Sequence, residues 1–314
     1  MNILVTGSEG LIGSKLVKEL LKRNHKIICL DLKKKNHINS KNVLFLKKNL
    51  LKKKDLLVSL KNKKIDLVIH LAAFLGVKKS ELFEVDCLET NIEGTKNLLE
   101  ICKKLKIKKI IFSSSSEVYG NLYKRKMRED DPLSPVSAYG VSKMCCETYI
   151  KAYSKKLLIK YNIIRFFNVY GNHQKEDFVI SKFAKLISKN KSINIFGNGT
   201  QVRSYCHVDD AVNGLINIIY KGKKNTTYNI GNDLEPVNLN KLVKYFEKLI
   251  KRKVRKKFIP FEKSDRSFKR EIFYRIPDIK KIKKDTSYMP IVKLEEGLRN
   301  ILKNEKNKRI SRIF

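Results

Sequence analysis

The residues best suited to chemistry are a tyrosine and a lysine four positions apart, Tyr139 and Lys143. This spacing places both side chains on one face of a helix, one turn apart. A tyrosine has a pKa of about 10 and is a poor base at neutral pH, but a neighbouring ammonium group favours the phenolate and lowers that pKa. Ser115, which follows the apolar run 110–112, can hydrogen-bond the same substrate hydroxyl. The three residues therefore suit the removal of a proton from an alcohol.

Three glycines follow the first apolar run of the chain, at Gly7, Gly10 and Gly13. They lie between an expected strand and an expected helix, as a dinucleotide-binding turn requires. The first permits a tight turn, the second lets the backbone approach a pyrophosphate, and the third allows close packing of helix on sheet. Asp31 ends the next apolar run and would accept hydrogen bonds from the adenosine ribose, which favours NAD over NADP. The positive ring of oxidised NAD would further favour a phenolate.

Short apolar runs alternate with segments of helical spacing in the first half of the chain. The runs that end in small or polar residues lie at 3–5, 27–30, 67–69 and 110–112, and the helical segments include 11–21 and 91–105. Strands that alternate with helices favour parallel pairing with right-handed crossovers. The expected fold is therefore α/β, a Rossmann doubly wound parallel sheet that binds ligands at the carboxyl ends of its strands.

Beyond about residue 165 the pattern becomes less regular, with clusters of Asn and Gly. We assign residues 1–165 to an NAD-binding Rossmann domain, with a return segment around 200–235. Residues 166–314 are assigned mainly to a smaller α+β substrate-capping domain.

The chain has 314 residues and a formal net charge of +38, and 56 of its 69 basic residues are lysines. These lysines are scattered without interleaved aromatic residues, which favours a surface rich in lysine over a dedicated nucleic-acid site. No apolar run reaches the length of a membrane span, so no membrane association is expected. The six cysteines show neither disulfide nor zinc-ligand spacing. We therefore expect a cytoplasmic protein without a metal site.

Longer motifs resemble the extended short-chain dehydrogenase/reductase family, whose members include nucleotide-sugar epimerases and dehydratases. The resemblance covers nearly the whole chain and rests on TGSEGLIG at 6–13, HLAA at 70–73, NIEGT at 91–95, SSSSEVYG at 113–120, YGVSK at 139–143, RFFNVYG at 165–171, GNGTQVRSYCHVDD at 197–210 and EEGL at 295–298.

The resemblance, closest to the UDP-glucose 4-epimerases, implies a hydride cycle on a UDP-, dTDP- or GDP-linked sugar. Tyr139 would take the proton of the sugar C4 hydroxyl while hydride passes to NAD, and Ser115 would orient that oxygen. Lys143 would also bind the nicotinamide ribose. The 4-keto sugar would then rotate about its diphosphate link and accept hydride on its other face, so that NAD is regenerated.

The same resemblance implies two sets of binding residues. The cofactor set is Gly7, Gly10, Leu11, Ile12, Gly13, Asp31, Asn49, Leu50, Leu71, Ala72, Ala73, Asn91, Tyr139 and Lys143. The substrate set is Ser115, Ser116 and Asn168 for the sugar, with Arg203 and either Arg270 or Arg275 for the diphosphate. His70, in the HLAA motif, is expected to shape the cofactor pocket rather than to act as a base.

Glu117 leaves the branch of the family open. A glutamate here resembles 4,6-dehydratases and UDP-glucuronate decarboxylases, in which it could remove a proton made acidic by the C4 ketone, so Glu117 is a candidate catalytic residue. Gly140, Val141 and Ser142 instead resemble the epimerases. A carboxylate that only pairs with a nearby lysine is the third interpretation. We place 4-epimerase first and a Glu117-assisted dehydratase or decarboxylase second.

A protein of another class stays possible, namely an NAD-binding regulator or nucleic-acid-binding protein without turnover. Ser115, Tyr139 and Lys143 together favour the enzyme. The family resemblance also implies a homodimer, formed by the helix after Asn91 and the helix that carries Tyr139.

Overall fold

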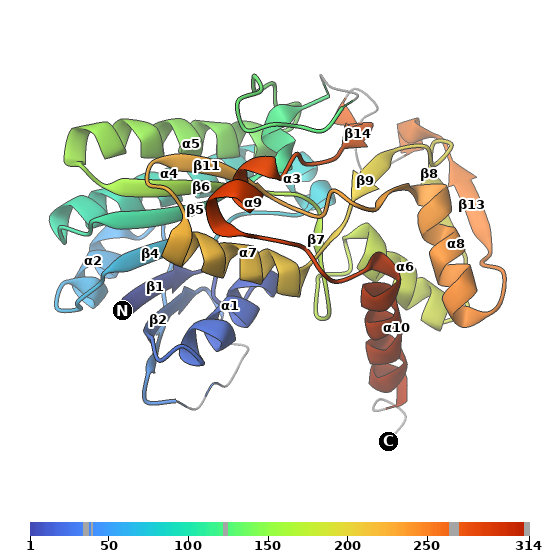
Figure 1. Cartoon of the computed structure of the whole chain (residues 1–314), viewed down its shortest axis with the longest axis horizontal. Helices are drawn as coiled ribbons and strands as arrows, with labels where there is room; N and C mark the ends of the chain where they lie inside the picture. Colours follow the sequence, from blue (N-terminus) through green and yellow to red (C-terminus); the bar gives the residue numbers. More distant parts are fainter. Residues whose placement is uncertain (34–37, 39, 122–124, 264–269, 311–314) are drawn as a thin grey trace.

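A seven-stranded parallel sheet forms the centre of the molecule (Figure 1). The computed structural model describes residues 1–33, 38, 40–121, 125–263 and 270–310. The strands run in the order β11-β6-β5-β4-β1-β2-β3, and each neighbouring pair is parallel. Their bounds are β1 (Asn2–Thr6), β2 (Lys26–Asp31), β3 (Val43–Lys47), β4 (Leu67–His70), β5 (Lys109–Ser115), β6 (Lys160–Phe166) and β11 (Thr226–Ile230). The predicted doubly wound sheet is confirmed.

Helices cover both faces of this sheet because its strands are apolar on both sides. In β1, Ile3 and Val5 join one buried cluster while Leu4 joins another on the opposite face. The first face carries α1 (Leu11–Leu21), α7 (Val208–Lys221) and α9 (Lys280–Thr286), and the second carries α2 (Lys53–Leu60), α4 (Glu84–Lys104) and α5 (Ala138–Leu157). No helix among the described residues is both long and apolar enough to cross a membrane.

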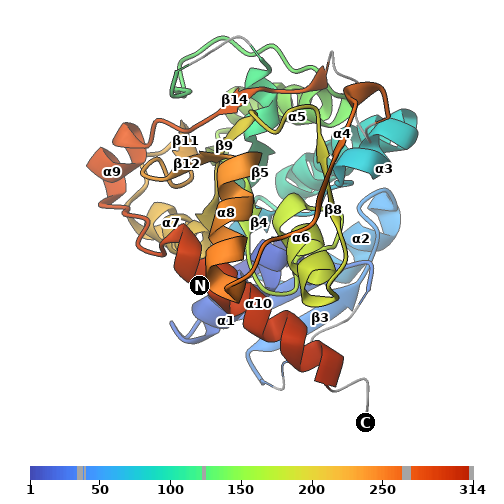
Figure 2. The same ribbon diagram turned by 90° about the vertical axis from the view of Figure 1, so that its right-hand side faces the viewer.

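A smaller part with its own buried cluster lies beside the carboxyl edge of the sheet (Figure 2). Its helices are α6 (Val179–Ser188), α8 (Leu239–Ile250) and α10 (Leu294–Ile310), and β8 (Ile193–Phe196) pairs with β13 (Lys256–Ile259). A three-stranded sheet contains β12 (Pro236–Asn238), β9 (Val202–Ser204) and β14 (Tyr274–Arg275), and β7 (Val169–Tyr170) pairs with β10 (Cys206–His207). Short helices complete the chain: α3 (Val77–Leu82), η1 (Ser116–Tyr119) and η2 (Phe261–Lys263).

The chain leaves the main sheet after β6 and later returns to it. Of the segment 200–235, α7 and β11 pack on the main sheet, whereas β9 belongs to the smaller sheet. The edge strand β11 is therefore supplied by a segment that follows part of the capping region.

Candidate functional site

The glycine turn between β1 and α1 is compact because three of its positions lack a side chain. Gly7 has a positive φ of 68°, and a Cβ there would lie 2.6 Å from the backbone nitrogen of Ala72. A Cβ on Gly13 would lie 2.2 Å from the carbonyl oxygen of Gly7, whereas one on Gly10 would keep 3.3 Å from it. The Gly10 nitrogen donates to the same oxygen at 3.1 Å, and Gly10 precedes the first turn of α1, which contains Leu11 and Ile12. This arrangement can receive a pyrophosphate at a helix N-terminus.

Asp31 lies at the carboxyl end of β2 with its carboxylate already oriented. Its Oδ2 accepts a hydrogen bond from the backbone nitrogen of Glu9 at 3.0 Å, and its Oδ1 accepts from that of Leu32 at 2.8 Å. A carboxylate has further acceptor capacity on both oxygens. The predicted acceptor for ribose hydroxyls is therefore positioned next to the glycine turn.

The segment after β4 forms another wall of the same edge. His70 is held between the hydroxyls of Thr6, at 2.7 Å, and Thr95, at 3.1 Å. Burial lowers the pKa of His70 to about 3, with Lys143 as a smaller cause. His70 is therefore neutral and fixed in place, and the Thr6 hydroxyl also accepts from the backbone nitrogen of Ala72 at 3.2 Å. These contacts hold Leu71, Ala72 and Ala73 against the glycine turn.

Asn91, Asn49 and Leu50, which are also predicted to bind the cofactor, make hydrogen bonds with other residues of the chain. The Asn91 amide accepts from the backbone nitrogen of Phe74 at 2.7 Å and donates to the Ser142 hydroxyl at 2.9 Å. Asn49 Oδ1 accepts from the backbone nitrogen of Leu51 at 3.0 Å. The Leu50 side chain would be 3.4 Å from a Cβ on Gly94 of α4, and its carbonyl accepts from Asn97. Asn91, Asn49 and Leu50 thus shape the loops that follow β4 and β3.

Ser115, Tyr139 and Lys143 come together where β5 ends and α5 begins. Ser115 lies near the Tyr139 phenol and lowers its pKa, and the Ser115 hydroxyl accepts from the backbone nitrogen of Glu117 at 3.2 Å. Lys143 is buried; its Nζ donates to the Ser113 carbonyl at 2.7 Å and lies 5.7 Å from the centre of the Tyr139 ring. Burial lowers the pKa of Lys143 to about 8.

The expectation that Lys143 lowers the pKa of Tyr139 is wrong for the chain without a bound cofactor. Burial raises the pKa of Tyr139, and the nearby Glu117 carboxylate raises it further, while the Ser115 contact lowers it. Lys143 does not counter the burial because its ammonium group is directed to the Ser113 carbonyl rather than to the phenol. A phenolate at Tyr139 therefore needs positive charge from a bound group.

Glu117 is buried and its two carboxylate oxygens are engaged. Oε2 accepts from the Ser137 hydroxyl at 2.7 Å, and Oε1 lies 3.6 Å from Nη1 of Arg275. Ser137 is also the N-cap of α5 and accepts from the backbone nitrogen of Gly140 at 3.1 Å. The partner of Glu117 is thus Arg275, not a lysine as in the third interpretation of this residue, and Ser116 is buried beside it.

The three arginines predicted to bind the diphosphate do not lie together. Arg203 in β9 and Arg275 in β14 are direct neighbours in a parallel ladder, so their side chains leave the same face. Arg270 instead pairs with Glu81 and Glu84 at the junction of α3 and α4. Arg203 also pairs with Glu271. Of the two alternatives for a diphosphate grip, Arg275 is the one adjacent to Arg203.

Asn168, the remaining candidate for sugar binding, has a positive φ of 39°, and its amide donates to the Ser204 carbonyl at 3.0 Å. This contact ties the loop after β6 to β9.

Sequence reasoning missed Ser137 and Tyr205. A serine directly before a helical segment is a usual N-cap, and this signal could have identified Ser137. Tyr205 lies two residues after Arg203, and both Arg203 and Arg275 act electrostatically on its hydroxyl, whose pKa burial raises to about 12. That hydroxyl is buried and has no hydrogen-bond partner in the described part of the chain.

Among the described residues, no three His, Cys, Asp or Glu side chains gather as metal ligands.

Comparison with known proteins adds a family and several relatives. A family model described as the NAD dependent epimerase/dehydratase family matches residues 3–231. A putative UDP-glucose 4-epimerase of Methanocaldococcus jannaschii is 36% identical, over 97% of this chain and 98% of that protein. A UDP-N-acetyl-alpha-D-glucosaminuronate decarboxylase of Bacillus cytotoxicus is 32% identical, over 95% of this chain and 96% of that protein. The crystal structure of a UDP-glucose 4-epimerase of Thermotoga maritima with UDP-glucose superposes with a TM-score of 0.89 at 30% identity, covering 99% and 100% of the two chains.

Proposed function

The chain belongs to the NAD-dependent epimerase/dehydratase family, and from that premise we propose that it is a nucleotide-sugar 4-epimerase. It is an NAD-dependent enzyme that acts on nucleotide sugars. The inversion at C4, the identity of the sugar and the roles of individual residues are the proposal.

The residues at the carboxyl edge fit NAD. Gly7 and Gly13 lack the side chains that would collide with the turn, and Gly10 is the N-cap residue of α1. Asp31 would accept hydrogen bonds from ribose hydroxyls, and the buried ammonium of Lys143 lies one helical turn from Tyr139. Bound NAD supplies a reversible hydride acceptor, so epimerisation needs no second substrate.

Tyr139 is the proposed acid and base of the reaction. Its phenol would take the proton from the C4 hydroxyl of the sugar and later return it, while the Ser115 hydroxyl holds the same oxygen. With Lys143 directed to the Ser113 carbonyl, the positive nicotinamide ring of bound oxidised NAD would supply the charge that favours the ionised phenol. Transfer of the hydroxyl proton to Tyr139 and of the C4 hydride to the bound cofactor would give a 4-keto sugar. Return of the hydride to the opposite face of C4, and of the proton to the oxygen, would give the C4 epimer.

Arg203 and Arg275 are the proposed grip on the diphosphate of the substrate. Guanidinium groups match phosphate oxygens in geometry and charge, and the two arginines lie side by side in one sheet. Asn168, at the neighbouring loop, would contact the sugar or the diphosphate.

The single observation that favours an epimerase over a dehydratase is the state of Glu117. A base that removes a carbon-bound proton needs a carboxylate directed at the substrate, and here both oxygens are engaged by Ser137 and Arg275. Glu117 then serves to join the N-cap of α5 to Arg275.

The test is to incubate purified protein, without added NAD, with UDP-, dTDP- and GDP-linked sugars, including UDP-glucuronate. Mass spectrometry and NMR should show a product of unchanged mass with inverted C4. Loss of water would instead indicate a dehydratase, and loss of carbon dioxide a decarboxylase. The absence of both product and bound cofactor would favour a regulatory protein without turnover, and a DNA complex that persists at physiological salt would favour a nucleic-acid-binding protein.

The Glu117→Gln variant distinguishes a structural role of Glu117 from a catalytic one. In an epimerase this variant should raise KM, because Arg275 loses its partner, and should still complete turnover. In a dehydratase it should form the 4-keto sugar and reduced cofactor but release no product. Glu235→Gln makes the same change at a carboxylate that only holds the start of α10, and it should behave as the unmodified protein.

We further propose that the protein acts as a homodimer in the cytoplasm. α4 and α5 pack side by side on one face of the sheet, where a second copy would complete a four-helix bundle (Figure 1). Six free cysteines suit a reducing compartment. Light scattering after size-exclusion chromatography would measure the mass of the assembly.

A further inference from the structure

A buried ion pair lies directly behind the proposed catalytic residues and takes no part in the chemistry described above. Glu147 follows Lys143 by one turn of α5, and Arg165 belongs to β6. Arg165 Nε donates to Glu147 Oε1 at 2.9 Å and Nη2 donates to Oε2 at 2.8 Å, so the contact is bidentate. Their side chains are 1% and 3% exposed.

Glu147 also binds the end of the strand that carries Ser115. The Ser114 hydroxyl donates to Glu147 Oε1 at 2.6 Å, and the carbonyl of Ser113 accepts from Lys143 at 2.7 Å. Two consecutive residues of β5 are therefore tied to α5 at two successive turns. Ser115 is the next residue, so its place relative to α5 is set by these two contacts.

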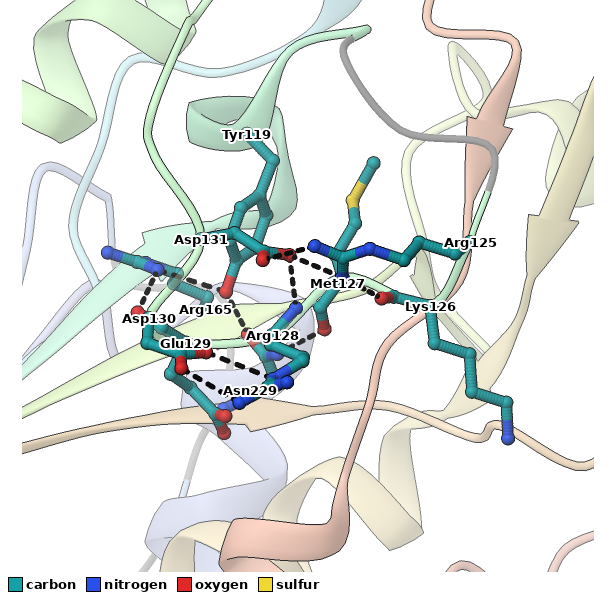
Figure 3. Close-up of polar contacts among 10 residues, drawn as sticks. All are labelled: Tyr119, Arg125, Lys126, Met127, Arg128, Glu129, Asp130, Asp131, Arg165 and Asn229. Atoms are coloured by element: carbon teal, nitrogen blue, oxygen red, sulfur yellow. Dashed lines mark hydrogen bonds and ion pairs between the residues drawn. The ribbon is translucent and has the colours of Figure 1, made fainter.

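Arg165 holds the other end of the same segment. Its Nη1 donates to the Tyr119 hydroxyl at 3.0 Å and to the Glu129 carbonyl at 3.1 Å, and Tyr119 donates to Asn229 Oδ1 at 2.7 Å (Figure 3). The stretch from Ser114 to Tyr119 is thus fixed at both ends by one ion pair.

Stability alone does not account for such a pair. Two charges taken out of water lose their hydration, and well-packed apolar residues of similar volume are often as stable or more stable in their place. Apolar residues, however, cannot hold a hydroxyl or a guanidinium in one direction. The directional contacts of Glu147 and Arg165 point to a role in geometry.

We propose that Glu147 and Arg165 are positioning residues, which fix the Ser115 hydroxyl at its working distance from Tyr139. This inference rests on the proposed function, because it assigns Ser115 and Tyr139 to the reacting oxygen. It predicts that loosening the Ser114 contact disturbs the chemical step more than substrate binding, since the arginines that hold the diphosphate lie in another sheet.

Ser114→Ala is the mildest test, because Glu147 keeps both contacts to Arg165 and no charge is left unpaired. We expect kcat to fall about tenfold, since small misplacements of reacting groups slow reactions strongly, with KM changed less than about twofold. The acid limb of kcat/KM against pH should also move to higher pH, because a weaker Ser115 contact removes one influence that lowers the pKa of Tyr139.

Ser181→Ala is the matched control, because it removes a buried hydroxyl that contacts Gln174 in the capping region. A purely structural loss would lower the melting temperature in both variants and leave the pH profile unmoved. Equal kcat and equal pH profiles in Ser114→Ala and Ser181→Ala would therefore overturn the positioning role.

A second measurement does not depend on turnover. Hydrogen exchange of the purified protein should be faster at residues 114–119 in Ser114→Ala than in the unmodified protein, and unchanged there in Ser181→Ala. If the unmodified protein converts no nucleotide sugar, the proposed function fails, and the exchange result still decides whether Glu147 fixes this segment. Unchanged exchange at 114–119 would refute the positioning.

Discussion

The Gly13→Ala substitution tests whether the glycine turn is built for a pyrophosphate. The added Cβ would lie 2.2 Å from the carbonyl oxygen of Gly7, well inside the distance at which these atoms repel. The turn and the start of α1 must therefore separate by roughly 1 Å. A hydrogen bond of about 2.9 Å lengthened by that amount is lost. Loss of one bond to a charged phosphate weakens binding by about 1.5 to 3 kcal/mol, so NAD affinity should fall roughly tenfold to 150-fold.

Isothermal titration of cofactor-free protein with NAD measures this change, and circular dichroism shows whether the variant is folded. Gly94→Ala is the control. Its Cβ would make an ordinary contact with Leu50 at 3.4 Å inside α4, where alanine also favours the helix. Affinity in Gly13→Ala equal to that of the unmodified protein would refute the proposal that this turn holds the pyrophosphate.

Tyr139→Phe should keep NAD bound and lose turnover by roughly 100-fold or more, because the phenol is the proposed acid and base; retained turnover would contradict that role. A different prediction concerns pH and His70, whose pKa is lowered to about 3 by burial. Below about pH 6.5 the unfolded chain binds a proton there that the folded chain does not, so the free energy of unfolding falls as pH falls from about 6.5 toward about 3. Between pH 7 and pH 5 this loss is about 2 kcal/mol. Urea unfolding at both pH values should show it, and in His70→Gln the loss should be smaller by that amount.

The sheet could be predicted because each early strand is an apolar run that ends at a turn residue. The glycine turn and the pair Tyr139 and Lys143 could be predicted for a similar reason. Each motif lies within a few residues of the strand or helix that positions it. The partner of Glu117 could not be predicted in this way. Arg275 is far away in the sequence, and it is brought near by the pairing of β14 with β9 and of residues 276–278 with Met127.

The raised pKa of Tyr139 could not be predicted from the sequence either. A spacing of four residues places Lys143 on the same helical face, but it does not show where the ammonium group points. The carbonyl of Ser113 is an alternative acceptor at the end of β5, and Lys143 binds it. Likewise, the motif that contains Asn91 gives no sign that its amide is directed to the backbone of Phe74 and to Ser142.

The late return of β11 has a consequence for how this chain folds during synthesis. β11 pairs with β6 along its whole length, and Asn162 of β6 also donates to the carbonyl of Lys223. Until residues 223–230 have left the ribosome, β6 can pair with β5 but its other edge is open, and it contains residues that are buried in the folded chain, such as Ile163 and Ile164. The Rossmann sheet is therefore completed only after much of the capping region has been made, and a nascent chain that stops short of β11 exposes an edge prone to association.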